Sequence, residues 1–219
     1  MKPIAVLFVL LALAALAVPA PAATIVVAGS GGDYADLGAA VEAAGSGDSI
    51  EVRAGAYPGS VTVNKTLSIT GSGDDCRIGT DDDGYALFVT AEGVAIRNLG
   101  LKGSDVALSL NTAHSTTIQG CRVEGGERGI LIAHSHAVTL ADCDISADFI
   151  AVDATNASQA RISGTRITGA TEGIVLQQAD HATLRENRIE DCGIGVFIHD
   201  SGDGILEDTT FSRVKGGVG

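Results

Sequence analysis

Three of the five histidines in this 219-residue chain have a spacing that would let them share one site. His134 and His136 are two positions apart, and His114 lies one period of an internal repeat before His136. Imidazole nitrogens bind copper and zinc, so three imidazoles within reach of one another would form a metal site. The spacing matches no recognised metal-binding motif, and a solvent-exposed turn is the alternative interpretation.

Two other groups of polar residues have possible chemistry. Residues 81–83 form an acidic run, but calcium prefers oxygen ligands at alternating positions, so a solvated loop is favoured over a calcium site. His199, with Asp200 or Asp203, has the composition of an acid/base pair. The same residues stand beside two glycines, as in an ordinary turn.

The repeat covers most of the chain. Residues 94–203 divide into five blocks of 22 without a gap, and a sixth block begins at residue 204. The blocks contain short apolar-alternating stretches separated by Gly, Asp, Asn and Ser, which predict strands and turns. No block has a helical half, which excludes leucine-rich, ankyrin and tetratricopeptide repeats. We predict an all-β, single-stranded parallel β-helix of about seven coils, in which each block is one coil.

Identical block positions stack in such a fold, because strands of neighbouring coils pair at about 4.8 Å. The fifteenth position (Leu108, Ile130, Val152, Ile174, Val196, Val218) should form one inward column of aliphatic side chains. The seventh position contains both Arg and Asp, which indicates an outward ladder of ion pairs. His114 and His136 share the twenty-first position and should therefore lie one above the other.

The four cysteines are too few for a disulfide scaffold in a chain of this length. Cys121 and Cys143 occupy the same column in adjacent coils, whereas Cys76 and Cys192 lie several coils apart. Stacking holds the two side chains of the column parallel, which favours two buried thiols over a disulfide.

The blocks resemble the right-handed parallel β-helix repeats of the pectin-lyase-like superfamily. Phrases such as "ATLRENRIEDCGIGVFIHDSGD" (182–203) are similar to the copper-maturation family NosD and to related surface proteins. The stretch at 31–73 looks like the opening of many such proteins, in which "DYADLGAAVEAA" (33–44) is a capping helix. Asp33 or Asp36 would be its N-cap. The resemblance implies the fold, whereas the function differs among its members.

One phrase, "ADFIAVD" (147–153), is similar to a motif of pectin methylesterases in which Asp148 would be the nucleophile-like carboxylate. The paired glutamines and the arginine with its tryptophan that accompany this motif are missing from the sequence, which has no Trp. We therefore interpret the match as chance.

Both termini lead to predictions. Lys2, an apolar run at 4–18 and "PAPAA" at 19–23 predict a secretory signal peptide over residues 1–23, followed by one domain over 24–219. The apolar run is shorter than the roughly 20 residues of a membrane span, so we expect no stable membrane insertion after cleavage.

The last block ends just where a strand should form at Val218. An incomplete C-terminal end, or end-to-end self-association through it, is therefore expected.

The predicted function follows from the fold and the charge. A net charge of −13 and the lack of a basic patch exclude nucleic acid as a partner. We favour a secreted, periplasmic or cell-surface protein that is not an enzyme, has no cofactor, and binds a polysaccharide or another surface ligand or is structural. One alternative is a polysaccharide-active lyase, epimerase or esterase. The other, implied by the resemblance, is a periplasmic copper-handling protein that uses His114, His134 and His136; zinc and calcium are further candidate ions. Asn64 and Asn156 lie in glycosylation motifs.

Overall fold

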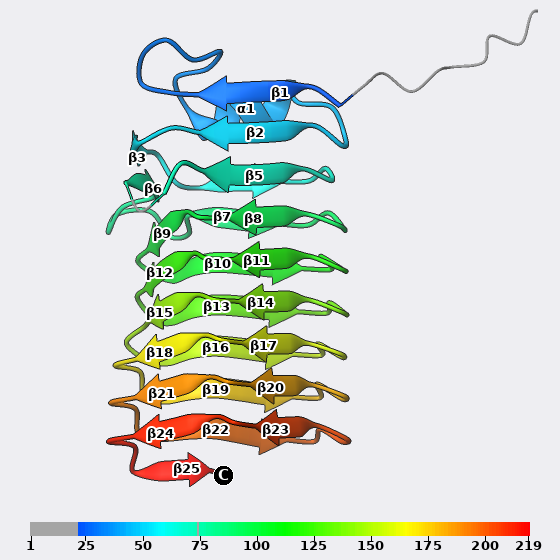
Figure 1. Cartoon of the computed structure of the whole chain (residues 1–219), viewed down its shortest axis with the longest axis vertical. Coiled ribbons are helices and arrows are strands. Elements are labelled where there is room, and N and C mark those ends of the chain that lie inside the picture. Colours follow the sequence, from blue (N-terminus) through cyan, green and yellow to red (C-terminus); the bar gives the residue numbers. More distant parts are fainter. Residues whose placement is uncertain (1–21, 74) are drawn as a thin grey trace, which may run out of the picture.

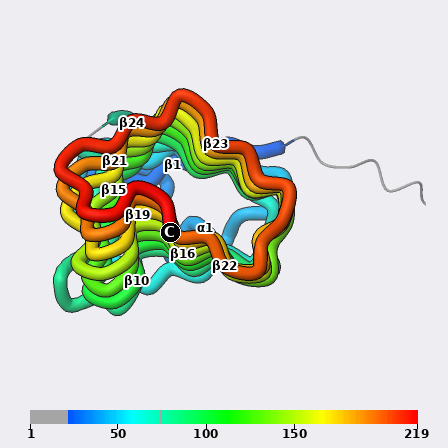
Figure 2. The backbone as a smooth tube through the Cα atoms, turned by 90° about the horizontal axis from the view of Figure 1, so that it is seen from below, coloured from blue at the N-terminus to red at the C-terminus, as the bar shows by residue number. Residues whose placement is uncertain are grey.

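The computed structural model describes residues 22–73 and 75–219 and shows a right-handed parallel β-helix (Figure 1). Three parallel sheets, named A, B and C here, run along its length and enclose one core (Figure 2). Sheet A has nine strands: β1 (Thr24–Val27), β2 (Ser49–Val52), β5 (Ser68–Gly71), β8 (Ala95–Arg97), β11 (Thr117–Gln119), β14 (Thr139–Ala141), β17 (Arg161–Ser163), β20 (Thr183–Arg185) and β23 (Ile205–Glu207).

Sheets B and C have eight strands each. Sheet B contains β3 (Gly55–Tyr57), β6 (Cys76–Ile78), β9 (Gly100–Gly103), β12 (Arg122–Gly125), β15 (Asp144–Ser146), β18 (Arg166–Thr168), β21 (Arg188–Glu190) and β24 (Thr210–Ser212). Sheet C contains β4 (Val61–Val63), β7 (Leu87–Val89), β10 (Val106–Asn111), β13 (Arg128–Ala133), β16 (Ile150–Thr155), β19 (Glu172–Gln177), β22 (Ile194–His199) and β25 (Gly216–Val218).

The predicted fold class is confirmed, but the predicted number of about seven coils is wrong, because sheet A has nine strands. The error arises in the first coils, whose lengths differ from the period of the repeat. The register pairs Thr24 with Ser49, Ser49 with Ser68 and Ser68 with Ala95. The second of these steps is shorter than the regular repeat, and the other two are longer. From Ala95 onward the steps are uniform, beginning with the pairing of Ala95 with Thr117.

The core consists of the predicted aliphatic columns. In sheet C, the register pairs the residues of the fifteenth position in one unbroken series from Leu108 to Val218. The members from Leu108 to Val196 have 0% exposure. Sheets A and B form equivalent columns, for example Ile118 on Leu140 and Val123 on Ile145. Burial of these columns against one another holds the coils together, because a single coil has no core of its own.

The corners of the coils depend on left-handed backbone conformations. Between sheets A and B, each repeat bends at one residue whose φ lies between 49° and 62°: Asn98, Gly120, Asp142, Gly164, Glu186 and Asp208. Gly, Asn and Asp adopt this conformation at little cost, which explains why they recur at this position. The turn between sheets C and A has two such residues in every repeat, for instance His134 and Ala137.

A short helix replaces the strands of sheets B and C in the first coil. Helix α1 (Leu37–Ala43) packs against β4, β1 and β2 and buries Leu37, Ala40 and Val41. The predicted capping helix at 33–44 is thus confirmed, with Asp36 as the N-cap that accepts a hydrogen bond from the Ala39 amide at 2.8 Å. Asp33 instead accepts from the amide of Val26.

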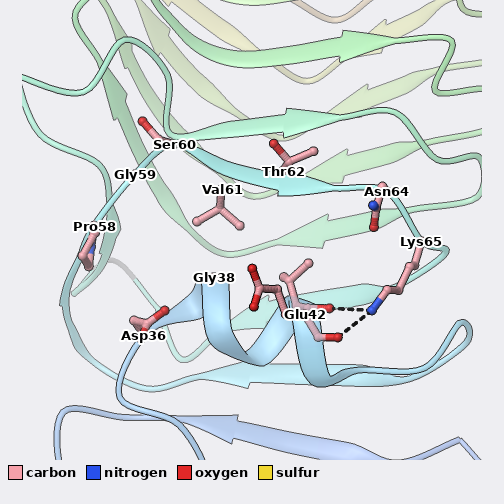
Figure 3. Close-up of a pocket in the computed structure, with 11 residues that line it drawn as sticks. Asp36, Gly38, Glu42, Pro58, Gly59, Ser60, Val61, Thr62, Asn64 and Lys65 are labelled. Carbon is pink, nitrogen blue, oxygen red and sulfur yellow. Dashed lines mark hydrogen bonds between the residues drawn. The ribbon is translucent and has the colours of Figure 1, made fainter.

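Lys65 fixes the other end of the helix. Its Nζ donates to the carbonyl oxygens of Val41 and Glu42 at 3.0 and 2.8 Å (Figure 3). It also donates to the carbonyl oxygen of Ala44 at 2.8 Å. A lysine in this position satisfies the carbonyls at the end of a helix and interacts favourably with the helix dipole. The groove of about 440 Å³ between α1 and β4 is therefore lined by groups that hold the cap, among them Asp36 and Lys65.

The opposite end of the β-helix exposes apolar side chains. In the last two coils, Ile198, Ile205, Leu206 and Val218 are 38%, 43%, 39% and 55% exposed. The predicted signal peptide lies outside the described residues, apart from residues 22 and 23. Over the residues that are described, no helix has both the length and the apolar composition needed to cross a membrane.

Candidate functional site

The predicted histidine site lies on the turns that connect sheet C to sheet A, between β10 and β11 and between β13 and β14. His114, His134 and His136 line one shallow hollow of about 350 Å³, together with Ser135, Asn156 and Ser158. His134 and His136 are exposed, and His114 is half-buried. The structure thus brings the three predicted residues to one place on the surface.

His114 and His136 stack as the repeat predicts. Their ring centroids are 4.1 Å apart and the ring planes differ by 35°. The backbone N–H of His136 donates to Nδ1 of His114 at 3.2 Å, so the lone pair of this nitrogen is already used as a hydrogen-bond acceptor. A metal ion bound at Nδ1 of His114 would have to replace that hydrogen bond, which contributes on the order of 1 kcal/mol.

Ser135 anchors the histidine turn through hydrogen bonds on its buried side. It is 2% exposed, and its Oγ donates to the carbonyl of Ala133 at 2.8 Å and accepts from the amide of Ala113 at 3.0 Å. The backbone between His134 and His136 is therefore fixed to the neighbouring coil, while the imidazoles stand outside it. Within residues 22–73 and 75–219, no group of three or more His, Cys, Asp or Glu side chains is placed so that it could hold a metal ion as it stands. The hollow is an open cluster of donors that must rotate to share one ion.

The cysteine column is confirmed as a pair of buried thiols. Cys121 and Cys143 are free, with exposures of 1% and 3%, at the corner between sheets A and B. The Cys143 thiol donates to the carbonyl of Ala141 at 3.2 Å. The neighbouring Cys121 thiol and the burial of the site raise the pKa of Cys143. Cys143 is therefore a protonated core thiol at neutral pH, whereas the hydrogen bond with Cys143 lowers the pKa of Cys121.

The acidic run at 81–83 forms a turn. Asp83 accepts from the amides of Thr80 and Gly59 at 2.9 and 3.2 Å, and Asp81 pairs with Lys102 at 2.9 Å. Hydrogen bonds and an ion pair therefore occupy these carboxylates, which supports the loop interpretation.

The group around His199 does not form one site. His199 Nε2 lies 3.3 Å from Asp200, whereas Asp203 lies 3.7 Å from a different histidine, His181. All of these side chains are more than half exposed. They lie on a solvated turn, with none of the burial that would tune an acid/base pair.

The outer face of sheet B carries ion pairs, but among the described residues of the predicted seventh-position ladder only Arg166 and Asp144 are paired, at 3.9 Å. Other pairs join seventh-position arginines to glutamates of the ninth position. Glu190 is 2% exposed and lies between Arg188 and Arg166, at 2.6 and 2.9 Å. Arg188 and then Arg166 hold the pKa of Glu190 below its ordinary value. Further along the face, Arg122 pairs with Glu124 at 2.9 Å. These carboxylates are engaged by arginines and are not available as general bases.

Sequence reasoning missed a second hollow on this face. It has a volume of about 300 Å³ and is lined by charged side chains of three successive coils: Asp75, Arg77, Lys102, Arg122 and Glu124. Its floor includes Gly79 and Gly100. Gly100 is the one signal in the sequence, because it stands first at the seventh block position, where the next four blocks carry Arg or Asp.

Comparisons with known proteins place the chain by sequence and by fold. Residues 42–213 match the profile of a family described as "Periplasmic copper-binding protein (NosD)". No curated protein matches the sequence.

Several solved structures share the fold. The catalytic domain of a GH87 α-1,3-glucanase in complex with nigerose is 12% identical, with a TM-score of 0.71, over 91% of this chain and 40% of that chain. A pectin methylesterase from Aspergillus niger is 14% identical, with a TM-score of 0.60, over 92% and 86% of the two chains. An alginate lyase from Paenibacillus sp. is 17% identical, with a TM-score of 0.55, over 87% and 76%. At these identities the likeness is one of fold alone.

Proposed function

This chain belongs to the NosD family of periplasmic copper-binding proteins, and from that premise we propose that it captures copper as an exchangeable cargo on the turn that carries His114, His134 and His136. The observation that carries the proposal is that three imidazoles from two adjacent coils line one exposed hollow. Imidazole is a suitable ligand for copper.

The openness of the hollow supports a role in transfer. Resident metal ions in structural sites are enclosed by four protein ligands in closed geometry. Here the imidazoles lie on the surface of a turn whose backbone is fixed by Ser135, so the side chains can rotate without moving the coil. A site of this kind would take up an ion and release it to a partner of higher affinity.

A binding role without catalysis agrees with the charges of the molecule. The buried carboxylate of Glu190 is held by two arginines, and Asp83 is held by backbone amides. A general base needs a carboxylate or imidazole that is free to take a proton from the substrate. The alternative, a polysaccharide-active enzyme, is suggested by the names of the solved neighbours, whose likeness to this chain is limited to the fold.

Calorimetric titration of the chain from residue 24 onward with Cu(II) tests the proposal. We expect one binding event, and His136→Ala should weaken it at least about tenfold, since it removes a ligand and one half of the stacked pair. The matched control is His181→Ala, which removes an exposed imidazole from the turn two coils further along.

Two results would contradict the proposal. One is an absence of Cu(II) binding by the unmodified chain. The other is an equal loss of affinity in the His136 and His181 variants, which would show that copper binds any exposed imidazole.

A further inference from the structure

Gly100 leaves a gap in a column of long side chains. On the outer face of sheet B, the register pairs Arg77 with Gly100, and Gly100 with Arg122. The column continues with Asp144, Arg166 and Arg188. Because adjacent strands are about 4.8 Å apart, the backbones of Arg77 and Arg122 are separated by about 9.6 Å, with bare backbone between them. A glycine inside a strand often marks a place where a ligand approaches the backbone closely.

Packing inside the protein does not demand this glycine. A Cβ at Gly100 would have Cys76 O as its nearest neighbour, at 3.2 Å, which requires a shift of only a few tenths of an ångström. The contrast is Gly79, where a Cβ would lie 2.1 Å from Lys102 O and where φ is 87°. Gly79 is therefore required by the fold, whereas at Gly100 the fold accepts larger residues, as the next coils demonstrate.

The charges around the hollow are balanced. Lys102 lies 2.9 Å from Asp81 and 3.8 Å from Glu124, and Glu124 accepts from Nε of Arg122 at 2.9 Å. With Arg77 and Asp75, the hollow and its edge hold three cations and three carboxylates among residues 75–219. Within the described part of the chain, the nitrogens of Arg122 beyond Nε and the guanidinium of Arg77 have no hydrogen-bond partner and can donate to a ligand, and the carboxylates have further lone pairs.

A neutral ligand with several hydroxyl groups suits this arrangement. Each hydroxyl both donates and accepts, so neighbouring hydroxyls can bridge a guanidinium and a carboxylate. An acidic ligand would gain no net attraction from a balanced edge and would be repelled by the protein, whose net charge is −13. One face of a sugar ring can lie on the backbone at Gly100 because no side chain rises from it.

We propose that this hollow, between Arg77 and Arg122 and above Gly100, is a binding site for one ring of a neutral saccharide. The site lies on sheet B and shares no residue with the histidine turn. The inference goes beyond copper capture and does not depend on it.

Backbone amide NMR spectra of the ¹⁵N-labelled chain, titrated with nigerose and with cellobiose, test the proposal. At least one of these neutral disaccharides should shift the amide signals of Gly79 and Gly100 in a saturable way. Digalacturonate serves as the acidic comparison and should shift them less. Gly100→Val should abolish the response by filling the floor, whereas Ser146→Val, on the same outer face of sheet B, should leave it unchanged.

Arg77→Ala provides a second variant that places no new atoms in the hollow. It should weaken the disaccharide response at least about tenfold, while Arg161→Ala, which removes an exposed arginine from sheet A, should not. The proposal is overturned if neither neutral disaccharide shifts the glycine signals, or if Gly100→Val responds like the unmodified chain. A stronger, salt-sensitive response to digalacturonate would overturn the assignment of a neutral ligand.

Discussion

Replacing Ile174 by Ala tests the stacked core most sharply. Ile174 lies on β19 with 0% exposure and pairs with Val152 on one side and Val196 on the other. The change removes three buried carbon groups, which at about 0.8 kcal/mol each amounts to about 2.4 kcal/mol of lost transfer free energy. The flanking coils are held by their own hydrogen bonds and cannot collapse fully into the space. A cavity contribution therefore brings the expected loss to about 3–4 kcal/mol.

Urea unfolding followed by far-ultraviolet circular dichroism measures this loss. The matched control is Gln177→Ala on the same strand, where the side chain is exposed and the expected change is within about 0.5 kcal/mol. A loss below about 1 kcal/mol for Ile174→Ala, or an equal loss in the two variants, would refute the register of the column. The slope of the free energy against urea should be the same in all three proteins, since the surface exposed on unfolding hardly changes.

Two further predictions concern acid stability and the thiols. The folded-state pKa of Glu190 lies below its ordinary value of 4.5. The ionised side chain therefore stabilises the fold fully above pH 4.5, and this stabilisation is lost as the pH falls through the lowered pKa. Glu190→Gln should flatten the acid side of a plot of melting temperature against pH, and an unchanged plot would contradict this. In the absence of a reductant, Cys121 and Cys143 should react with a thiol reagent only after the protein is unfolded. If these two thiols fail to react in the unfolded protein as well, they form a disulfide.

The repeat alone was sufficient to predict the fold class, because a constant period with apolar residues at fixed positions has few structural solutions. The stacking of His114 on His136 and of Cys121 on Cys143 followed from the same period, without any knowledge of coordinates. The first coils could not be counted, because three successive steps of unequal length between the strands of sheet A leave no period to detect. Pairing of backbones across coils tolerates such differences as long as the extra residues lie in turns.

The sites were less accessible to sequence reasoning than the columns. The left-handed residue at each corner could have been recognised from the recurrence of Asn, Gly and Asp at the fifth block position, where these residues are favoured. The hollow above Gly100 depends on Arg77, which belongs to a coil outside the regular repeat, so its neighbours could not be aligned. The orientation of the imidazole rings around His136 depends on side-chain rotamers, which a sequence period does not determine.

Electron paramagnetic resonance of the chain loaded with one equivalent of Cu(II) tests the central claim most directly. Nitrogen ligands produce a recognisable superhyperfine pattern, and we predict a pattern from at least two imidazole nitrogens. This pattern should disappear when His114, His134 and His136 are all changed to Ala, while His181→Ala should leave it intact. A spectrum without nitrogen coupling, or one that survives the triple change, would contradict the assignment of the histidine turn as the copper-binding site.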